Sequence, residues 1–139
     1  MEVQAGALIG KTYMTEYSIR SYAHLGDAVY EVWAREKTIN LTSRPEKLHK
    51  MTIAIVNAEF HAQILEKIEE YLDATEKDIV RRARNMPVTT ARRVNQKLHR
   101  LSTAFEALIG YLYLNNRERL NAVYLLIEPF VEEKLSQMV

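Results

Sequence analysis

Apolar residues recur at helical spacing along most of this chain. Residues at positions i, i+3, i+4 and i+7 share one face of a helix, and such stripes predict helices over about 46–57, 58–72 and 118–135. No segment alternates apolar and polar residues as a half-buried strand does, so the sequence predicts an all-α fold. The first stripe, which we expect to face the core, consists of Leu25, Ala28, Val29, Val32 and Trp33.

Local signals place further helix boundaries. Thr75 can cap a short helix with its hydroxyl group, and residues 86–101 are the most loop-like part of the chain. A strongly apolar helix is expected over 102–114. The length suits one unit of structure. We therefore predict a single compact helical domain over 1–139, with its core over about 18–135.

The composition is that of an ordinary globular chain, with 47% hydrophobic and 27% charged residues. It lacks the apolar run of about 18 residues that a membrane span needs. The N-terminal stretch has neither the basic start nor the long apolar segment of a secretion signal. The absence of cysteine excludes disulfides and thiolate metal sites and fits a reducing compartment. We expect a cytoplasmic protein with no membrane contact.

Basic residues are concentrated in one segment. Residues 77–100 contain eight Lys or Arg and a single acid, Asp78, so this segment has a net charge of +7. Since the whole chain carries +1, the remainder carries −6. A basic block on an acidic body indicates a polyanionic partner. The alternative is a solvated helix with counter-charged neighbours.

Two carboxylates stand out against their surroundings. Glu106 is the only charged residue of the predicted helix 102–114, and Gly110, one turn later, has no side chain to cover it. We expect Glu106 to look out over a shallow hollow, beside water, a cation or a polar partner. Asp27 likewise follows a glycine, Gly26. The alternative is that both are ordinary solvent-face residues, or that Asp27 caps a helix.

His24 and Glu31 lie about one helical turn before and after Asp27. We interpret His24 as a surface or packing histidine. Glu31 can pair with Arg35, four residues further on, or support Asp27 at a site. The helix pair is the favoured interpretation.

The two acids and the basic block together indicate a chemistry. Mg²⁺ prefers oxygen ligands, commonly one or two carboxylates with several waters. Such an ion can activate water and neutralise charge at a scissile phosphate. A basic segment beside it would hold a polyphosphate and make binding salt-sensitive. The combination predicts hydrolysis of phosphodiester bonds in a nucleic acid.

Several stretches resemble motifs of the ribonuclease III family. HLGDAVYE at 24–31 is similar to the family's first acidic helix, and FEALIGYLYL at 105–114 is similar to its second. RPEKLHK at 44–50 and RRARN at 81–85 resemble the Mini-III branch, which has the nuclease domain but no double-stranded-RNA-binding domain. The similarity covers most of residues 18–135 and implies the ribonuclease III endonuclease-domain fold.

The resemblance gives Asp27 and Glu106 the places of the family's catalytic, metal-binding acids. It implies an endoribonuclease that uses Mg²⁺, with Mn²⁺ as a substitute, to hydrolyse phosphodiester bonds of double-stranded RNA and leave 5′-phosphate ends. The implied role is maturation of the large-subunit (23S) ribosomal RNA precursor, with a ribosomal protein as a further candidate partner.

The chain departs from the full ribonuclease III pattern at two positions. Ala23 stands where the larger enzymes carry a Glu four residues before the first acid, and Thr103 where they carry an Asp three residues before the second. These losses leave fewer metal ligands. They motivate an alternative, a non-catalytic RNA-binding or ribosome-associated protein that retains the nuclease fold. A third interpretation is a helical protein-interaction module with no nucleic-acid role.

The resemblance also implies a homodimer, since two sites related by a two-fold axis can cut both strands of a duplex. Tyr22, Leu25 and Trp33 are candidate interface contacts, with core packing as their alternative role. Without a separate binding domain, the nuclease domain must itself recognise the shape and phosphates of A-form RNA. The basic residues that could bind RNA could instead form ion pairs within the chain. The candidate RNA-binding residues are Arg81, Arg82, Arg84, Arg92, Arg93, Lys97, Lys47 and Lys50.

Overall fold

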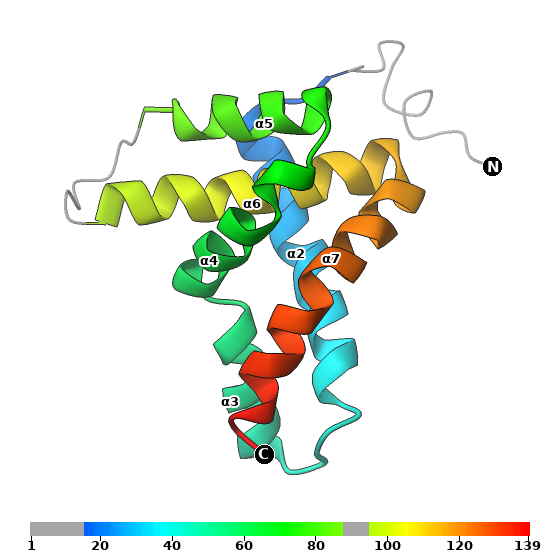
Figure 1. Ribbon diagram of the computed structural model, residues 1–139. Helices are drawn as coiled ribbons and strands as arrows, with labels where there is room; N and C mark the ends of the chain where they lie inside the picture. The colour runs from blue at the N-terminus through cyan, green and yellow to red at the C-terminus, as the bar shows by residue number, and fades with distance from the viewer. Residues whose placement is uncertain (1–15, 88–94) are drawn as a thin grey trace, which may run out of the picture.

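The computed structural model describes residues 16–87 and 95–139, and it confirms the all-α prediction (Figure 1). Within those ranges there is no strand, and no helix is both long enough and apolar enough to cross a membrane. The elements are α2 (Ile19–Thr38), α3 (Pro45–Ile55), α4 (Ala58–Ile68), the short 3₁₀ helix η1 (Glu69–Tyr71), α5 (Ala74–Arg84), α6 (Gln96–Asn115) and α7 (Arg117–Ser136).

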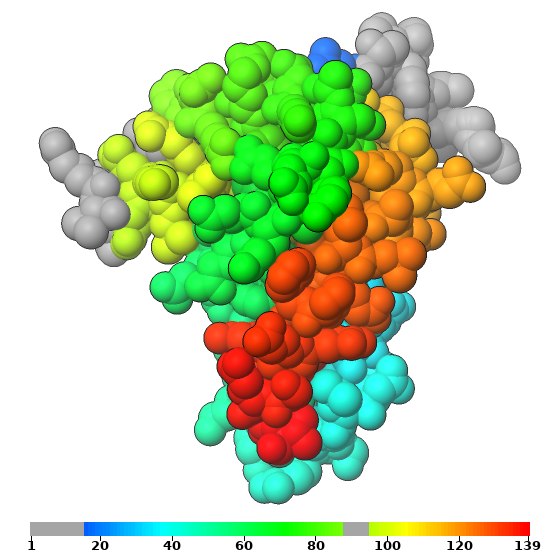
Figure 2. All heavy atoms as spheres, in the orientation of Figure 1, coloured from blue at the N-terminus to red at the C-terminus, as the bar shows by residue number. Residues whose placement is uncertain are grey.

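The central helix of the domain is α6. It packs against α2, α4, α5 and α7, and Phe105, Ala107, Leu108 and Ile109 in its middle are fully buried. In Figure 1, α5 lies on one side of α6. Helix α2 begins beside α5, crosses α6 and runs, like α7, toward α3 at the far end of the molecule. The space-filling view is accordingly broad at α5 and α6 and narrows toward α3 and the C-terminus (Figure 2).

Two local predictions need correction. The start of α5 is capped by Asp73 rather than Thr75: the Asp73 carboxylate accepts a hydrogen bond from the backbone N–H of Glu76, and the Glu76 carboxylate accepts one from the N–H of Asp73. This reciprocal arrangement satisfies two N–H groups that a helix start leaves free. The expected loop over 86–101 is also too long, because α6 already begins at Gln96.

The face of α2 that packs into the core differs from the predicted one. Leu25, Val29 and Trp33 are only half-buried, Ala28 is exposed, and Val32 is 59% exposed. The predicted core stripe is therefore wrong. The buried residues of α2 are Ile19, Tyr22, Ala23, Gly26, Tyr30, Ala34 and Thr38.

The larger apolar residues of α2 line a surface hollow instead. This hollow, of about 770 Å³, lies between α2, the end of α6 and α7, and Leu25, Val32 and Trp33 form part of its wall. The ring of Trp33 stacks on that of Tyr124 of α7, with centroids 4.6 Å apart. Tyr22, the third candidate interface residue, is 1% exposed and takes its alternative role in the core.

Candidate active site at the α2–α6 crossing

Two glycines allow α2 and α6 to cross in direct backbone contact. A Cβ atom on Gly26 would lie 1.8 Å from the backbone oxygen of Glu106, and one on Gly110 would lie 1.9 Å from the backbone oxygen of Tyr22. Only glycine fits at either position, because the obstacles are backbone atoms rather than flexible side-chain ends. The expected hollow over Gly110 is therefore wrong, since the backbone of α2 fills that space.

This crossing brings the two predicted acids together. Asp27 directly follows Gly26 and is exposed, whereas the Glu106 side chain is 21% exposed. Burial, followed by the charge of Asp27 and a hydrogen bond with the Asp27 carboxyl group, together raise the pKa of Glu106 to about 8. Such an interaction requires adjacent groups. The structure thus places two acids from opposite halves of the chain side by side.

The carboxyl pair fits a divalent cation. Two neighbouring carboxylates, one of them open to solvent, are a donor set that Mg²⁺ uses together with several waters. A cation between them would favour the ionised form of Glu106 against the burial and the Asp27 charge that raise its pKa. No group of three or more His, Cys, Asp or Glu side chains in the described ranges is arranged as a metal site. An ion held here would therefore keep most of its ligands as water.

Both departures from the family pattern lie at this crossing. Ala23 on α2 and Thr103 on α6 are each 8% exposed. Neither residue provides a carboxylate. Of the four positions that are acidic in the larger enzymes, this chain therefore has an acid only at Asp27 and Glu106.

A buried histidine lies on the core side of Glu106. His61 of α4 is 2% exposed, and its Nδ1 lies 3.2 Å from Oγ of Ser102 and 3.7 Å from Oε2 of Glu106. The imidazole packs against the rings of Tyr30 and Phe105. Burial lowers the pKa of His61 to about 4, so the ring is neutral at neutral pH.

His61 escaped prediction from the sequence, although one signal was present. It precedes Ile64 and Leu65 by three and four residues, so it shares the buried face of its helix. A polar group on such a face usually has a polar partner. The sequence could indicate that a partner was needed, but not that Ser102 and Glu106, some forty residues later, would lie next to the ring.

The neighbours of Asp27 on α2 form ordinary surface contacts. The Glu31 carboxylate accepts hydrogen bonds from the Arg35 guanidinium at 2.9 and 2.6 Å, which confirms the helix pair. His24 is exposed, as a surface histidine is expected to be.

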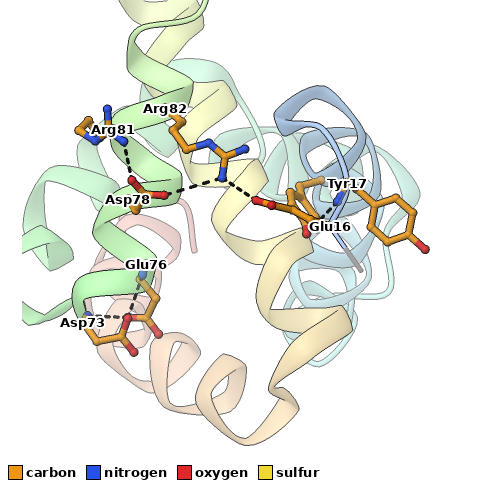
Figure 3. A network of polar contacts seen from close by, with 8 residues as sticks. Glu16, Tyr17, Asp73, Glu76, Asp78, Arg81 and Arg82 are labelled. Atoms are coloured by element: carbon orange, nitrogen blue, oxygen red, sulfur yellow. Dashed lines mark hydrogen bonds and ion pairs between the residues drawn. The ribbon is translucent and has the colours of Figure 1, made fainter. Parts of the chain in front are cut away.

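All three arginines of α5 form ion pairs within the chain, and Figure 3 shows those of Arg81 and Arg82. A guanidinium nitrogen of Arg81 lies 2.5 Å from Asp78, and one of Arg82 lies 2.8 Å from Glu16 and 3.7 Å from Asp78. The alternative of intramolecular pairing therefore applies to both. The Arg81 side chain is still 63% exposed, against 34% for Arg82, so Arg81 is the more accessible of the two.

Arg84 and Lys97 come together at a second surface hollow, of about 620 Å³, between α4, α5 and the start of α6. Arg84 also pairs with Glu69 at 2.7 Å. The hollow combines basic with acidic side chains, so it is not a purely cationic surface. Its charged residues are Glu59, Glu66, Arg84, Lys97 and Arg100.

The other candidate RNA-binding residues do not lie beside Arg84 and Lys97. Lys47 and Lys50 lie on α3, at the opposite end of the molecule from α5 (Figure 1). Arg92 and Arg93 lie outside the described residues. Over 16–87 and 95–139, the predicted RNA-binding residues are therefore spread along the molecule rather than joined in one patch.

Comparison with known proteins shows which family this chain resembles. The model of the Ribonuclease III domain matches residues 20–117, which include both acids of the crossing. The chain is 39% identical to the Mini-ribonuclease 3 of Gloeobacter violaceus, over 81% of this chain and 84% of that protein. It is 42% identical to the Mini-ribonuclease 3 of a Thermoanaerobacter species, over 80% of each. A crystal structure of a Fusobacterium nucleatum protein matches with a TM-score of 0.75 at 31% identity, covering 86% of this chain and 96% of that one.

Proposed function

Because the chain belongs to the ribonuclease III family, in its Mini-ribonuclease 3 branch, we propose that it is an endoribonuclease that cuts double-stranded RNA with a divalent metal ion. The observation that carries the proposal is the adjacency of Asp27 and Glu106 where α2 and α6 cross. The family match spans both acids. We further propose that the 139 residues act as a single nuclease domain.

Asp27 and Glu106 are the residues that would hold the ion, which when bound supplies an activated water and positive charge at the scissile phosphate. Asp27 is exposed, so its oxygens face the side from which an RNA backbone can approach. Glu106 must release its proton to become a ligand, which couples metal binding to proton release. The backbone contact at Gly26 keeps the two carboxyl groups at a fixed spacing before substrate arrives. The expected products carry 5′-phosphate and 3′-hydroxyl ends.

We assign RNA binding to exposed basic side chains of α5 and of the start of α6. Arg81, Arg84 and Lys97 are exposed, and exposed ion pairs such as Arg81–Asp78 contribute little free energy, so they can exchange for contacts to phosphate. Arg82, with two acidic partners, is the less accessible candidate. Affinity should fall steeply with salt, because phosphate contacts release counterions.

The finer assignments rest on family resemblance alone. These are the 23S ribosomal RNA precursor as natural substrate, a ribosomal protein as partner, Mn²⁺ as a substitute for Mg²⁺, and a cytoplasmic location. Each stays a prediction.

One observation favours the alternative of a non-catalytic RNA-binding protein. Ala23 and Thr103 leave the crossing with two acids where the full family pattern has four. A pair of carboxylates can still hold Mg²⁺ with water completing its shell, which is why the catalytic proposal is preferred.

Cleavage of a long RNA duplex by the purified protein tests the proposal directly. We expect fragments with 5′-phosphate ends in the presence of Mg²⁺ and intact duplex when a chelator is added, because the acids need the ion to act on the phosphate. Single-stranded RNA of the same base composition is the substrate control. Duplex binding with no cleavage at any concentration of Mg²⁺ or Mn²⁺ would instead establish the non-catalytic alternative.

We also propose that a second copy of the chain covers the apolar hollow of α2 and α7. Val32 and Leu125 in its wall are 59% and 69% exposed, which is unusual for large apolar side chains on one continuous surface. An isologous dimer would bury this surface on both copies at once. It would also set two pairs of acids at a fixed separation, as cutting both strands of a duplex requires.

Val32→Asp is expected to convert the dimer into monomers, because it places an unpaired charge in an apolar interface. Sedimentation velocity over a series of protein concentrations measures the effect. Ile53→Asp on α3 is the matched control: Ile53 is 46% exposed and lies outside this hollow, so that variant should remain dimeric. A wild-type protein that sediments as a monomer at every concentration contradicts the dimer.

A further inference from the structure

His61 is buried in a setting where packing alone would favour an apolar residue. Its ring packs against those of Tyr30 and Phe105, with its centroid 5.0 Å from the centroid of each. A buried polar group lowers stability unless it is hydrogen-bonded. Here Nδ1 has Ser102 as a partner at 3.2 Å, while Nε2 has none among residues 16–87 and 95–139. The polar contacts of this side chain are therefore made by Nδ1 and lie on the side of the ring that faces α6.

The position of the imidazole proton follows from these contacts. A neutral imidazole carries one N–H group and one acceptor nitrogen. A hydrogen on Nε2 would be a buried donor without an acceptor in the described part of the chain. Once Glu106 is ionised, as a metal ligand must be, a hydrogen on Nδ1 meets Oγ of Ser102 and lies near the negative charge of Glu106. The hydrogen-bond network thus assigns the proton to Nδ1. The positive end of the N–H dipole then faces Oε2 of Glu106 at 3.7 Å.

Ser102 fixes this arrangement from α6. It lies one helical turn before Glu106 and is 8% exposed. Its hydroxyl is bonded to the imidazole of His61, so the ring cannot rotate away from the carboxylate without breaking that hydrogen bond. His61 and Ser102 together approach Glu106 from the core, on the opposite side from solvent.

We infer that His61 is a positioning residue for Glu106: with Ser102, it holds one edge of the carboxylate from the core side, so that the other oxygen is presented toward Asp27 and a shared cation. This inference rests on the proposed function. A ligating carboxylate is commonly oriented by such a partner behind it, and loss of the partner typically weakens metal affinity or activity by about 10–100-fold. His61 itself touches neither RNA nor the ion.

Metal binding without RNA tests this role. Mn²⁺ is titrated into the wild-type protein and into His61→Leu and His61→Asn, with electron paramagnetic resonance reporting free ion. We expect His61→Leu to weaken Mn²⁺ binding by about tenfold or more. His61→Asn should bind nearly as well as wild type, because its amide nitrogen can stand where Nδ1 stands and still donate. With RNA present, the loss in His61→Leu should be overcome by more Mg²⁺ and leave the KM for duplex unchanged.

Two further variants separate positioning from stability. Thr52→Val removes a buried hydrogen bond to Thr38 that lies elsewhere in the fold, so it should lower the melting temperature without changing Mn²⁺ affinity. Ser102→Ala frees the imidazole without opening a large cavity, and should weaken Mn²⁺ binding even if His61→Leu does not fold.

Mn²⁺ affinity equal to wild type in both His61→Leu and Ser102→Ala would overturn the positioning role while leaving the proposed function intact. In case His61→Leu does not fold, wild-type affinity in Ser102→Ala alone overturns it. Wild-type protein that neither binds Mn²⁺ nor cuts duplex overturns the proposed function, and the role of His61 with it.

Discussion

Asp27→Asn and Glu106→Gln are each expected to lower the rate of duplex RNA cleavage by roughly 10²–10⁴-fold, which corresponds to losing the several kcal/mol that a bound ion supplies at the scissile phosphate. Both changes keep the size of the side chain and remove one carboxylate from the pair at the α2–α6 crossing. The rate is measured on a long duplex at saturating Mg²⁺. Glu31→Gln is the matched control, because Glu31 lies one turn from Asp27 on the same helix but pairs with Arg35.

The Glu106→Gln protein should be folded, which makes the loss of cleavage interpretable. The pKa of Glu106 is about 8 in the folded protein, against an ordinary value near 4.5. The folded state therefore keeps a proton that the unfolded chain releases, and stability falls as pH rises between these values. The uncharged amide of Glu106→Gln does not titrate, so the variant does not lose stability in this pH interval. In thermal unfolding without metal ions, the melting temperature of the variant should be at least that of wild type at pH 8. The difference between the two melting temperatures should be smaller at pH 5.

Cleavage at the wild-type rate by folded Asp27→Asn and Glu106→Gln proteins would contradict the assignment of these two acids. Loss of cleavage in Glu31→Gln to the same extent would show that the effect is not confined to the pair.

Gly26→Ala is expected to unfold the domain or to destabilise it by about 3–5 kcal/mol, a large share of the usual stability of a domain. The new Cβ would lie 1.8 Å from a backbone oxygen of α6, so the two helices must separate. Helix propensity alone predicts the opposite sign, because alanine is favoured over glycine in a helix by about 1 kcal/mol. Urea denaturation, followed by circular dichroism, measures whether Gly26→Ala lowers or raises the free energy of unfolding.

Gly110→Ala provides an independent check on the same contact from the other helix, with a Cβ 1.9 Å from the backbone oxygen of Tyr22. Either variant, if it folds, should lose cleavage as well, because separating the helices separates the acids they carry. Stability equal to or above wild type in both would show that the helices do not cross in backbone contact.

The apolar pattern of α2 shows where prediction from sequence fails. Two apolar faces share this helix, and hydropathy favours the one with Leu25, Val29, Val32 and Trp33. The face that is buried carries Gly26 and other small residues, because another backbone passes directly over it. Periodicity gives the number of residues per turn, but it does not say which apolar face meets the core and which meets solvent or a second copy.

The basic block shows the same limit for charge. The sequence correctly located a dense run of arginines, but the partners of Arg82 and Arg84, Glu16 and Glu69, lie many residues away in the chain. An ion pair between distant residues depends on how the helices pack. The net charge of a segment therefore does not establish how much of that charge is available to RNA.

Local spacing, composition and short motifs are enough to predict the helical class, most helix positions and the two candidate acids. Helix packing brings Gly26 and Gly110 together at a crossing, places Asp27 beside Glu106 there, and sets His61 on the core side of Glu106. The two differ in the sequence separation of the contacts involved. A helix forms through contacts within four residues, whereas the site forms where helices far apart in the sequence come into contact.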